Sequence, residues 1–219
     1  MSIEIWLSGF FFYLIIITNI ASSIFGYKTF GDVDSDTQLK KINKNPTKFK
    51  ISIVLILIEH FSIVSLAVTL FIAFSPYNII LGIVWFIFRT GEGLIQIYDK
   101  KNYWGLLNLA EKYSDTSGPE KDALIDLGSS ILKTKSSRFS FAQILFSIGT
   151  FSYSILFVIY GVVPVIIGWF GIVASILYGF GNGINRIKPD FKVLWNIGGL
   201  LIFVFEVVLG GWLLFFSQI

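Results

Sequence analysis

Residues 51–98 read ISIVLILIEHFSIVSLAVTLFIAFSPYNIILGIVWFIFRTGEGLIQIY, and this stretch decides the fold. It contains two apolar runs, 51–74 and 79–98. Each run is close to the ~20 residues that a helix needs to cross the hydrocarbon core of a membrane. The four residues between the runs include Pro76, which cannot continue a helix. The stretch therefore predicts two antiparallel membrane-spanning helices joined by a tight turn.

Similar apolar runs occur along the rest of the chain. The predicted spans cover residues 5–25, 51–74, 79–98, 139–160, 163–182 and 193–216. Backbone polar groups in lipid must bond to one another, and a helix satisfies them within itself. Strands of a β-barrel would be ~10 residues long with alternating polarity, and these runs are longer and do not alternate. We therefore expect an all-α, polytopic transmembrane six-helix bundle that forms one integral membrane domain over residues 1–219.

The composition of the chain also indicates a membrane protein. Hydrophobic residues make up 54% of the 219 residues and charged residues 14%, whereas a soluble domain carries about 25% charged residues. So much apolar surface excludes a water-soluble domain and a disordered chain. The absence of Cys excludes disulfides, zinc–thiolate sites and cysteine nucleophiles. The net charge of +3 is small and scattered, so we expect the lipid bilayer as a partner and no nucleic acid.

The basic side chains predict how the chain is oriented. Three polar connectors, 27–50, 99–138 and 183–192, hold 16 of the 17 Lys and Arg residues. The two termini and the two tight turns hold none. By the positive-inside rule, the three long loops are cytoplasmic and both termini lie outside. We therefore expect a multi-pass protein of the cell (plasma) membrane.

The connector between the third and fourth spans has structure of its own. Apolar residues recur on one helical face over residues 102–113, and a second helix start is indicated by Pro119. We predict short amphipathic helices in this loop that lie at the membrane interface. The simpler interpretation is that they cover the cytoplasmic ends of the bundle. The alternative is a docking platform for a partner.

Among the polar side chains inside the predicted spans, six are candidates for one polar layer. They are Glu59 and His60 in the second span, Arg89, Glu92 and Gln96 in the third, and Glu206 in the sixth. Each unpaired charge at the middle of the bilayer costs about 2.5–3.5 kcal/mol on insertion scales. We therefore expect these side chains to face the bundle interior. Counting ~1.5 Å of rise per residue, the charged ones fall within one layer about 8 Å thick.

The layer has two interpretations. Arg89 and Glu92 are three residues apart, so they share a helix face and can form an ion pair. Three carboxylates facing one Arg leave an excess of negative charge, so we expect a protonated Glu or a charged His60. The layer is then either an ion-paired lock that fixes helix order or a polar cavity for a proton, an ion or a small ligand. One His favours neither a metal site nor a metal cofactor, and we predict none.

Three segments resemble the multi-pass membrane family called domain of unknown function 4386. Residues 85–93, WFIFRTGEG, are similar to the Phe-Arg-x-x-Glu segment of that family. Residues 206–214, EVVLGGWLL, are similar to its closing Glu…Trp-Leu-Leu signature. The hairpin over residues 156–171, with Pro164 and Gly168, is similar to its Pro-centred turn. The resemblance spans nearly the whole chain.

This resemblance implies a six-helix fold and points to Arg89, Glu92 and Glu206 as positions of interest. The family has no assigned activity, so the resemblance implies no substrate or cofactor. Members of the family carry basic residues at the N-terminus and in the tight turns, which implies termini inside the cell. This chain has none there, so its own charges predict the opposite orientation.

Three classes of function fit these features. The one we favour is an integral membrane protein that binds or transports a small ligand or ion at an intramembrane Arg/Glu polar site. The second is a non-catalytic accessory subunit of a membrane complex, and either could form a homo-oligomer. The third is a membrane-embedded lipid-modifying enzyme. No phosphate, metal or nucleophile motif supports the third class, so we lean against an enzyme and predict no catalytic residue.

Overall fold

The computed structural model describes residues 2–27, 34–188 and 193–216, and within these ranges the regular structure is helical. The helices are α1 (Ile3–Ile24), α2 (Ser35–Lys44), α3 (Pro46–Phe74), α4 (Ile79–Trp104), α5 (Leu106–Asp115), α6 (Pro119–Tyr160), α7 (Val165–Ile187) and α8 (Val193–Gly211), followed by the short π-helix η1 (Trp212–Phe216). Six helical stretches, built on α1, α3, α4, α6, α7 and α8, are long and apolar enough to cross a membrane. The predicted fold class is confirmed.

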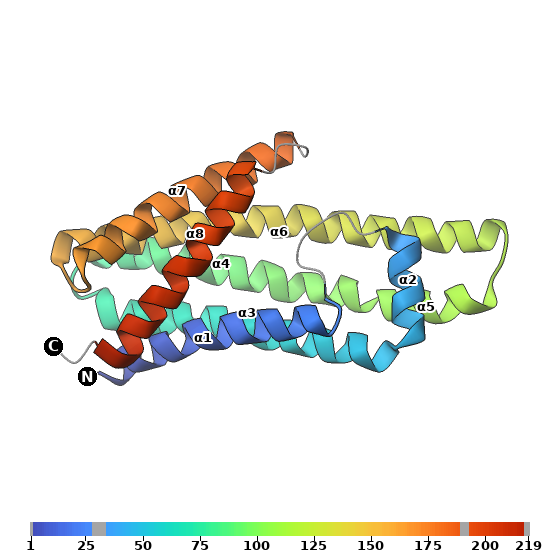
Figure 1. Ribbon diagram of the computed structural model, residues 1–219, viewed down its shortest axis with the longest axis horizontal. Helices are drawn as coiled ribbons and strands as arrows, with labels where there is room; N and C mark the ends of the chain where they lie inside the picture. The colour runs from blue at the N-terminus through green and yellow to red at the C-terminus, as the bar shows by residue number, and fades with distance from the viewer. Residues whose placement is uncertain (1, 28–33, 189–192, 217–219) are drawn as a thin grey trace.

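The six long helices form an elongated bundle (Figure 1). Successive helices pack side by side in the order α1, α3, α4, α6, α7 and α8, and α8 closes the arrangement by contacting α1. The beginning of α1 and the end of η1 lie at one end of the bundle, beside the two tight turns. We call this end the turn end, and the opposite end, where α2 and α5 lie, the loop end.

Local sequence explains where the helices at the turn end begin and stop. The Asn78 side chain accepts a hydrogen bond from the Leu81 backbone N–H at 3.1 Å, which caps the start of α4. Gly161 ends α6 in the left-handed conformation, with φ of 59°, which glycine adopts without a steric penalty. Pro164 precedes the first residue of α7. These residues fix two antiparallel hairpins, as their positions in the sequence predict.

The hydrophobic core has one large part at each end of the bundle. The turn-end part includes Ile63, Phe74 and Trp85, and the loop-end part includes Ile56 and Tyr103. Along α3, Ile56 and Ile63 belong to different parts, and the polar pair at positions 59 and 60 lies between them. The polar layer therefore separates two apolar cores along the bundle axis.

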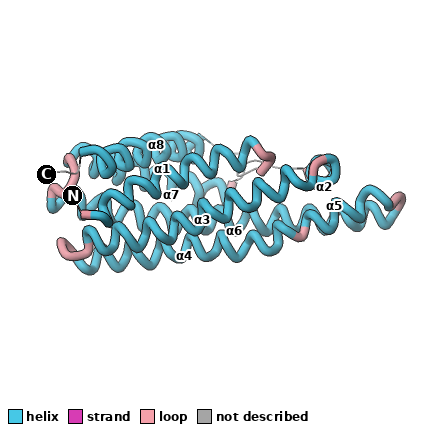
Figure 2. The backbone as a smooth tube through the Cα atoms, turned by 90° about the horizontal axis from the view of Figure 1, so that it is seen from below, coloured by secondary structure: helices cyan, strands magenta, loops and turns pink. Residues whose placement is uncertain are grey.

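The loop end differs in detail from the sequence prediction. The second predicted amphipathic segment is the first part of α6, which runs unbroken through 42 residues into the membrane span. In Figure 2, α5 continues the direction of α4, so these segments extend the bundle along its axis. Leu106 and Tyr113, on the apolar face of α5, are buried in the loop-end core.

Helix α2 was not expected from the sequence. Asp34 caps it by accepting a hydrogen bond from the Thr37 N–H at 2.9 Å, and Leu39 and Ile42 face the loop-end core. The Tyr113 hydroxyl donates a hydrogen bond to Asp36. Hydrogen bonding to Lys40 and then to Tyr113 lowers the pKa of the Asp36 carboxyl below its ordinary value. These contacts hold α2 against α5.

Glycines allow α8 to approach its neighbours closely. An ideal Cβ at Gly198 would lie 2.6 Å from Tyr178 Cα on α7, and one at Gly181 would lie 2.7 Å from Trp195 Cα on α8. At the turn end, a Cβ at Gly9 on α1 would lie 2.8 Å from the Gly210 carbonyl oxygen. Small residues commonly permit such backbone contact between membrane helices. The position of α8 therefore depends on these glycines.

Replacement of Gly198 by alanine tests the contact between α7 and α8. The added methyl group would meet the backbone of Tyr178, so the two helices must separate. We expect Gly198→Ala to lower the free energy of unfolding by about 1–3 kcal/mol, the usual cost of overpacking. The measurement is reversible unfolding of the purified protein in detergent.

The neighbouring Gly199→Ala variant is the matched control. Its Cβ would meet only the Tyr178 ring, at 3.5 Å, which is ordinary van der Waals contact. Alanine also favours a helix over glycine by roughly 0.5–1 kcal/mol, so this variant should be as stable as the natural protein or slightly more stable. Equal stability of the two variants would contradict the close packing at Gly198.

Candidate functional site

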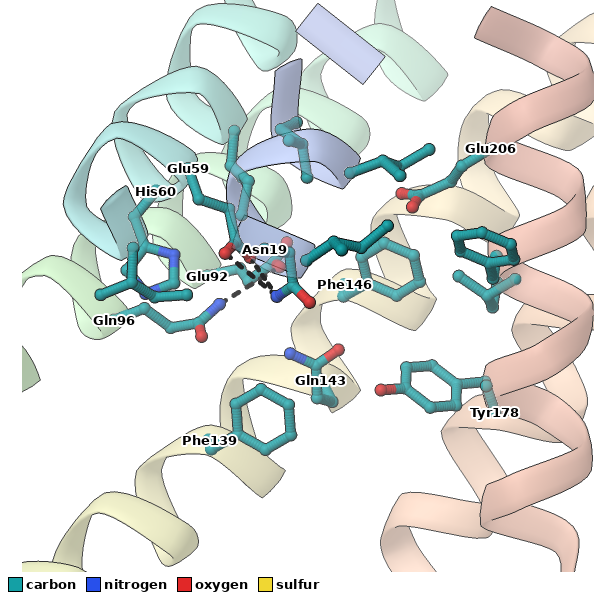
Figure 3. Close-up of a pocket in the computed structure, with 18 of the residues that line it drawn as sticks. Asn19, Glu59, His60, Glu92, Gln96, Phe139, Gln143, Phe146, Tyr178 and Glu206 are labelled. Carbon is teal, nitrogen blue, oxygen red and sulfur yellow. Dashed lines mark hydrogen bonds between the residues drawn. The ribbon is translucent and has the colours of Figure 1, made fainter. Parts of the chain in front are cut away.

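A cavity of about 480 Å³ lies inside the bundle between its two cores. Side chains from all six long helices line it, and most of the lining is apolar. The six polar residues predicted from the sequence all lie on this lining: Glu59, His60, Arg89, Glu92, Gln96 and Glu206. Figure 3 shows five of them around the cavity, with Glu206 entering from the opposite side to Glu59 and Glu92. The structure therefore brings the sequence-predicted residues to one place.

One face of α4 supplies half of these residues. Trp85, Arg89, Glu92 and Gln96 are all buried, and their spacing of three and four residues places them on one side of the helix. The same face continues to Asp99 and Lys100 at the loop end. A helix that would otherwise expose charge to lipid therefore turns its polar stripe toward the bundle interior.

Arg89 is the best-contacted member of the site. Its Nη1 lies 2.6 Å from Glu92 Oε2, and the side chain is only 1% exposed. The guanidinium carbon lies 4.4 Å from the ring centre of Phe146 and 5.2 Å from that of Trp85. Gly149 on α6 makes room for it, because a Cβ there would lie 2.9 Å from Arg89 Cγ. The ion pair and two aromatic faces thus hold the guanidinium.

The other two carboxylates of the site have no cationic partner within hydrogen-bond distance in the described residues. Glu59 accepts hydrogen bonds from the Asn19 amide at 3.0 and 3.1 Å. Asn19 is a neutral partner that the sequence analysis missed, and the signal was a lone amide inside the first apolar span. Glu206, on α8, forms no hydrogen bond or ion pair with any residue that the structure describes. Of the three carboxyl groups of the site, Glu92 is therefore the one that is paired with a cation in the described residues.

His60 also lacks a hydrogen-bond partner. Its side chain is 2% exposed, and in the described part of the chain neither ring nitrogen has a partner. Gln96 lies beside it in Figure 3 and donates to Glu92 at 3.4 Å. Buried polar groups in proteins are nearly always hydrogen-bonded. A buried imidazole that lines a cavity without a partner is therefore available to a bound molecule.

Aromatic and basic residues close the cavity at the loop end. Tyr27 lines the cavity, and the ammonium groups of Lys100 and Lys135 lie 5.1 and 4.6 Å from its ring centre. Burial, together with the neighbouring Tyr103, raises the pKa of the Tyr27 hydroxyl well above its ordinary value. The hydroxyl therefore stays protonated at neutral pH.

Chemically, the cavity can hold charge and accept hydrogen bonds. The lining adds Gln143 and Tyr178 to the six predicted residues. In the ranges described, no group of three His, Asp or Glu side chains is arranged to hold a metal ion. The arrangement offers carboxylate and imidazole acceptors next to aromatic faces.

The chain belongs to the protein family described as Domain of unknown function (DUF4386), whose family model matches residues 7–216. The predicted resemblance to this family is confirmed over nearly the whole chain. No curated protein and no solved structure matches it. The comparisons therefore assign the family and leave the function to be argued from the cavity.

The Arg89–Glu92 pair can be tested by a double-mutant cycle. Arg89→Leu leaves Glu92 buried without its cation, and we expect a loss on the order of 1–3 kcal/mol in the free energy of unfolding. Combining Arg89→Leu with Glu92→Gln should recover much of that loss, because neither partner is then left alone. The measurement is again unfolding of the purified protein in detergent.

Arg138→Leu is the control for this cycle. Arg138 Nη1 lies 3.0 Å from Asp99 Oδ1 at the loop end, but its side chain is 33% exposed. The buried Asp99 carboxylate also lies 3.9 Å from Lys100 Nζ, so it keeps a cationic neighbour when Arg138 is removed, and this variant should lose less stability than Arg89→Leu. If Arg89→Leu is as stable as the natural protein, the buried ion pair does not hold α4 in place.

Proposed function

We propose that this DUF4386 protein is a membrane-embedded binding or transport-type protein that holds a small ligand in the cavity beside Arg89 and Glu92. One observation carries the proposal: polar groups on the cavity lining, His60 and Glu206, have no partner among the described residues. A lock that only fixes helix order would pair its charges, because an unpaired buried polar group costs about 1–3 kcal/mol. The polar groups without partners therefore favour a ligand-binding site over an ion-paired lock that only fixes helix order.

The cavity also favours a small molecule over a bare ion. Its volume of about 480 Å³ falls within the roughly 300–1,000 Å³ of typical ligand pockets. Most of its lining is apolar, with side chains such as Ile15, Ile63 and Ile202 between the polar groups. An ion bound at the carboxylates would leave this apolar space unfilled. A ligand with an apolar body and a polar group matches both parts of the lining.

The proposed orientation follows from the basic residues. With six spans, both termini lie on one side of the membrane, and the Lys and Arg residues gather in the loops at the other end. We propose that the loop end is cytoplasmic, that the turn end faces outward, and that the protein resides in the cell membrane. A ligand in the cavity would then lie near the middle of the bilayer.

Reporter fusions test the orientation. A reporter that is active only in the cytoplasm should be inactive when fused after Ile219 and active when inserted near residue 117, between α5 and α6. The expected pattern follows from the clustering of positive charge in the loops. A cytoplasmic signal from the fusion after Ile219 would reverse the proposed orientation.

Filling the cavity tests ligand binding. The probes are decylamine, decanol and decanoate, added at equal membrane mole fractions to the protein in phosphatidylcholine nanodiscs. We expect at least one probe to raise the thermal unfolding temperature of the natural protein, because a ligand that binds only the folded state stabilises it. Gly199→Phe, which places a ring in the cavity beside Tyr178, should abolish that rise.

Gly183→Phe is the matched control for Gly199→Phe. An ideal Cβ at Gly183 meets no atom within 4 Å, and Gly183 does not line the cavity. This variant should respond to the probes as the natural protein does. If no probe stabilises the natural protein, or if both Phe variants respond equally, the cavity is not a site for this class of ligand.

A further inference from the structure

From the charges, acceptors and aromatic rings around the cavity, we infer that its ligand carries an ammonium group on an apolar body whose tail extends into the lipid between α1 and α8. This inference rests on the proposed function, because it names the class of ligand that the cavity takes.

The charge balance of the layer favours a cation. Three carboxyl groups, those of Glu59, Glu92 and Glu206, line the cavity, but Arg89 is the one Lys or Arg residue on the described lining, and Lys100 and Lys135 lie behind Tyr27 at the loop end. Arg89 is already paired with Glu92 at 2.6 Å. Glu59 accepts hydrogen bonds from the neutral Asn19 amide, and Glu206 has no partner in the described ranges. A bound monocation would supply the missing charge between α3 and α8.

The hydrogen-bonding groups of the lining also favour an ammonium ligand. An ammonium group donates hydrogen bonds and accepts none, so its site must supply acceptors. Glu206 supplies carboxylate oxygens, and a neutral His60 supplies one unprotonated ring nitrogen that has no partner among the described residues. A carboxylate ligand would instead require free cationic donors. Arg89 Nη1 already binds Glu92, and a carboxylate that bonded to Arg89 Nε, which has no partner among the described residues, would compete with Glu92 for the same guanidinium.

Aromatic side chains complete a site for an ammonium group. Phe139, Phe146, Tyr178 and Trp195 line the cavity, and Figure 3 shows the first three around the polar centre. Aromatic faces attract cations within about 6 Å of the ring centre. Phe146 already contacts the Arg89 guanidinium at 4.4 Å in this way. Tyr178, whose ring packs edge-on against Phe146, adds a second aromatic side chain to this part of the lining.

The arrangement of α1 and α8 explains where the apolar tail goes. At the turn end the helices touch, because Gly9 faces Gly210 and the Tyr13 hydroxyl donates to the Val207 carbonyl oxygen at 3.1 Å. Toward the loop end, α8 diverges from α1 (Figure 1). On this side, the cavity-lining residues Ile20 and Phe203 are 51% and 45% exposed. The cavity therefore has an edge that faces lipid.

A comparison of probes that differ in their polar group tests the inference. We measure binding of decylamine, decanol and decanoate to the protein in phosphatidylcholine nanodiscs, at equal membrane mole fractions. We expect decylamine to bind about tenfold more tightly than decanol, because a paired ammonium–carboxylate contact in low dielectric outweighs a neutral hydrogen bond. Hexadecylamine should bind with an affinity comparable to that of decylamine, because its longer tail lies in lipid.

Glu206→Gln identifies the carboxylate that binds the ammonium group. We expect this variant to lose about tenfold in decylamine affinity and to keep its decanol affinity, since the change removes charge and little volume. Retained decanol binding also shows that the variant is folded. Glu120→Gln, at an exposed position at the loop end, is the matched control and should bind decylamine as the natural protein does. A Glu206→Gln variant that keeps full decylamine affinity would overturn the role of Glu206.

The outcomes separate this inference from the proposed function. If decanol or decanoate binds as tightly as decylamine and Gly199→Phe abolishes that binding, the cavity is a ligand site and the ammonium assignment is wrong. If hexadecylamine fails to bind while decylamine binds, the tail does not pass between α1 and α8. If none of the probes binds, the proposed function fails together with the inference.

Discussion

The buried ion pair between Arg89 and Glu92 is the contact on which the interior of this bundle depends. A guanidinium in the middle of a membrane is tolerated only when it is paired and shielded from lipid. Here it lies between the rings of Trp85 and Phe146, and glycine at position 149 leaves space for its side chain. These requirements orient α4 and bring α6 close to it. The cavity forms where the remaining carboxylates meet the same layer.

The two ends of the bundle differ in how they are stabilised. At the turn end, short connectors, a glycine cap and close glycine contacts hold the helices together. At the loop end, α2 and α5 add an apolar core around Tyr103, with hydrogen bonds such as that from Tyr113 to Asp36. The polar layer lies between these two well-packed regions. A site placed there is held by rigid elements while one of its walls, α8, diverges from α1.

The sequence predicts much of this fold because a lipid environment permits few backbone structures and few positions for charged side chains. Apolar runs of sufficient length must be helices, and Pro76 and Pro164 mark the turns between them. Charged side chains such as Arg89 and Glu206 must face inward, because exposing a charge to lipid raises the free energy of the protein. This free-energy cost explains why both side chains lie on the cavity. Side-chain partners are less predictable. Asn19 binding Glu59 depends on how α1 lies against α3, and helix α2 depends on a core that only the folded loop end creates.

The central claim is that the cavity beside the ion pair holds a ligand whose polar end meets Glu206. The most direct measurement is an experimental structure of the protein purified from its own membrane and kept in lipid. We expect elongated non-protein density in the cavity, with one end within hydrogen-bond distance of the Glu206 carboxylate and the other end between α1 and α8. A cavity closed by α8 packing against α1 along its whole length, with Glu206 bonded to Arg89, would contradict the claim.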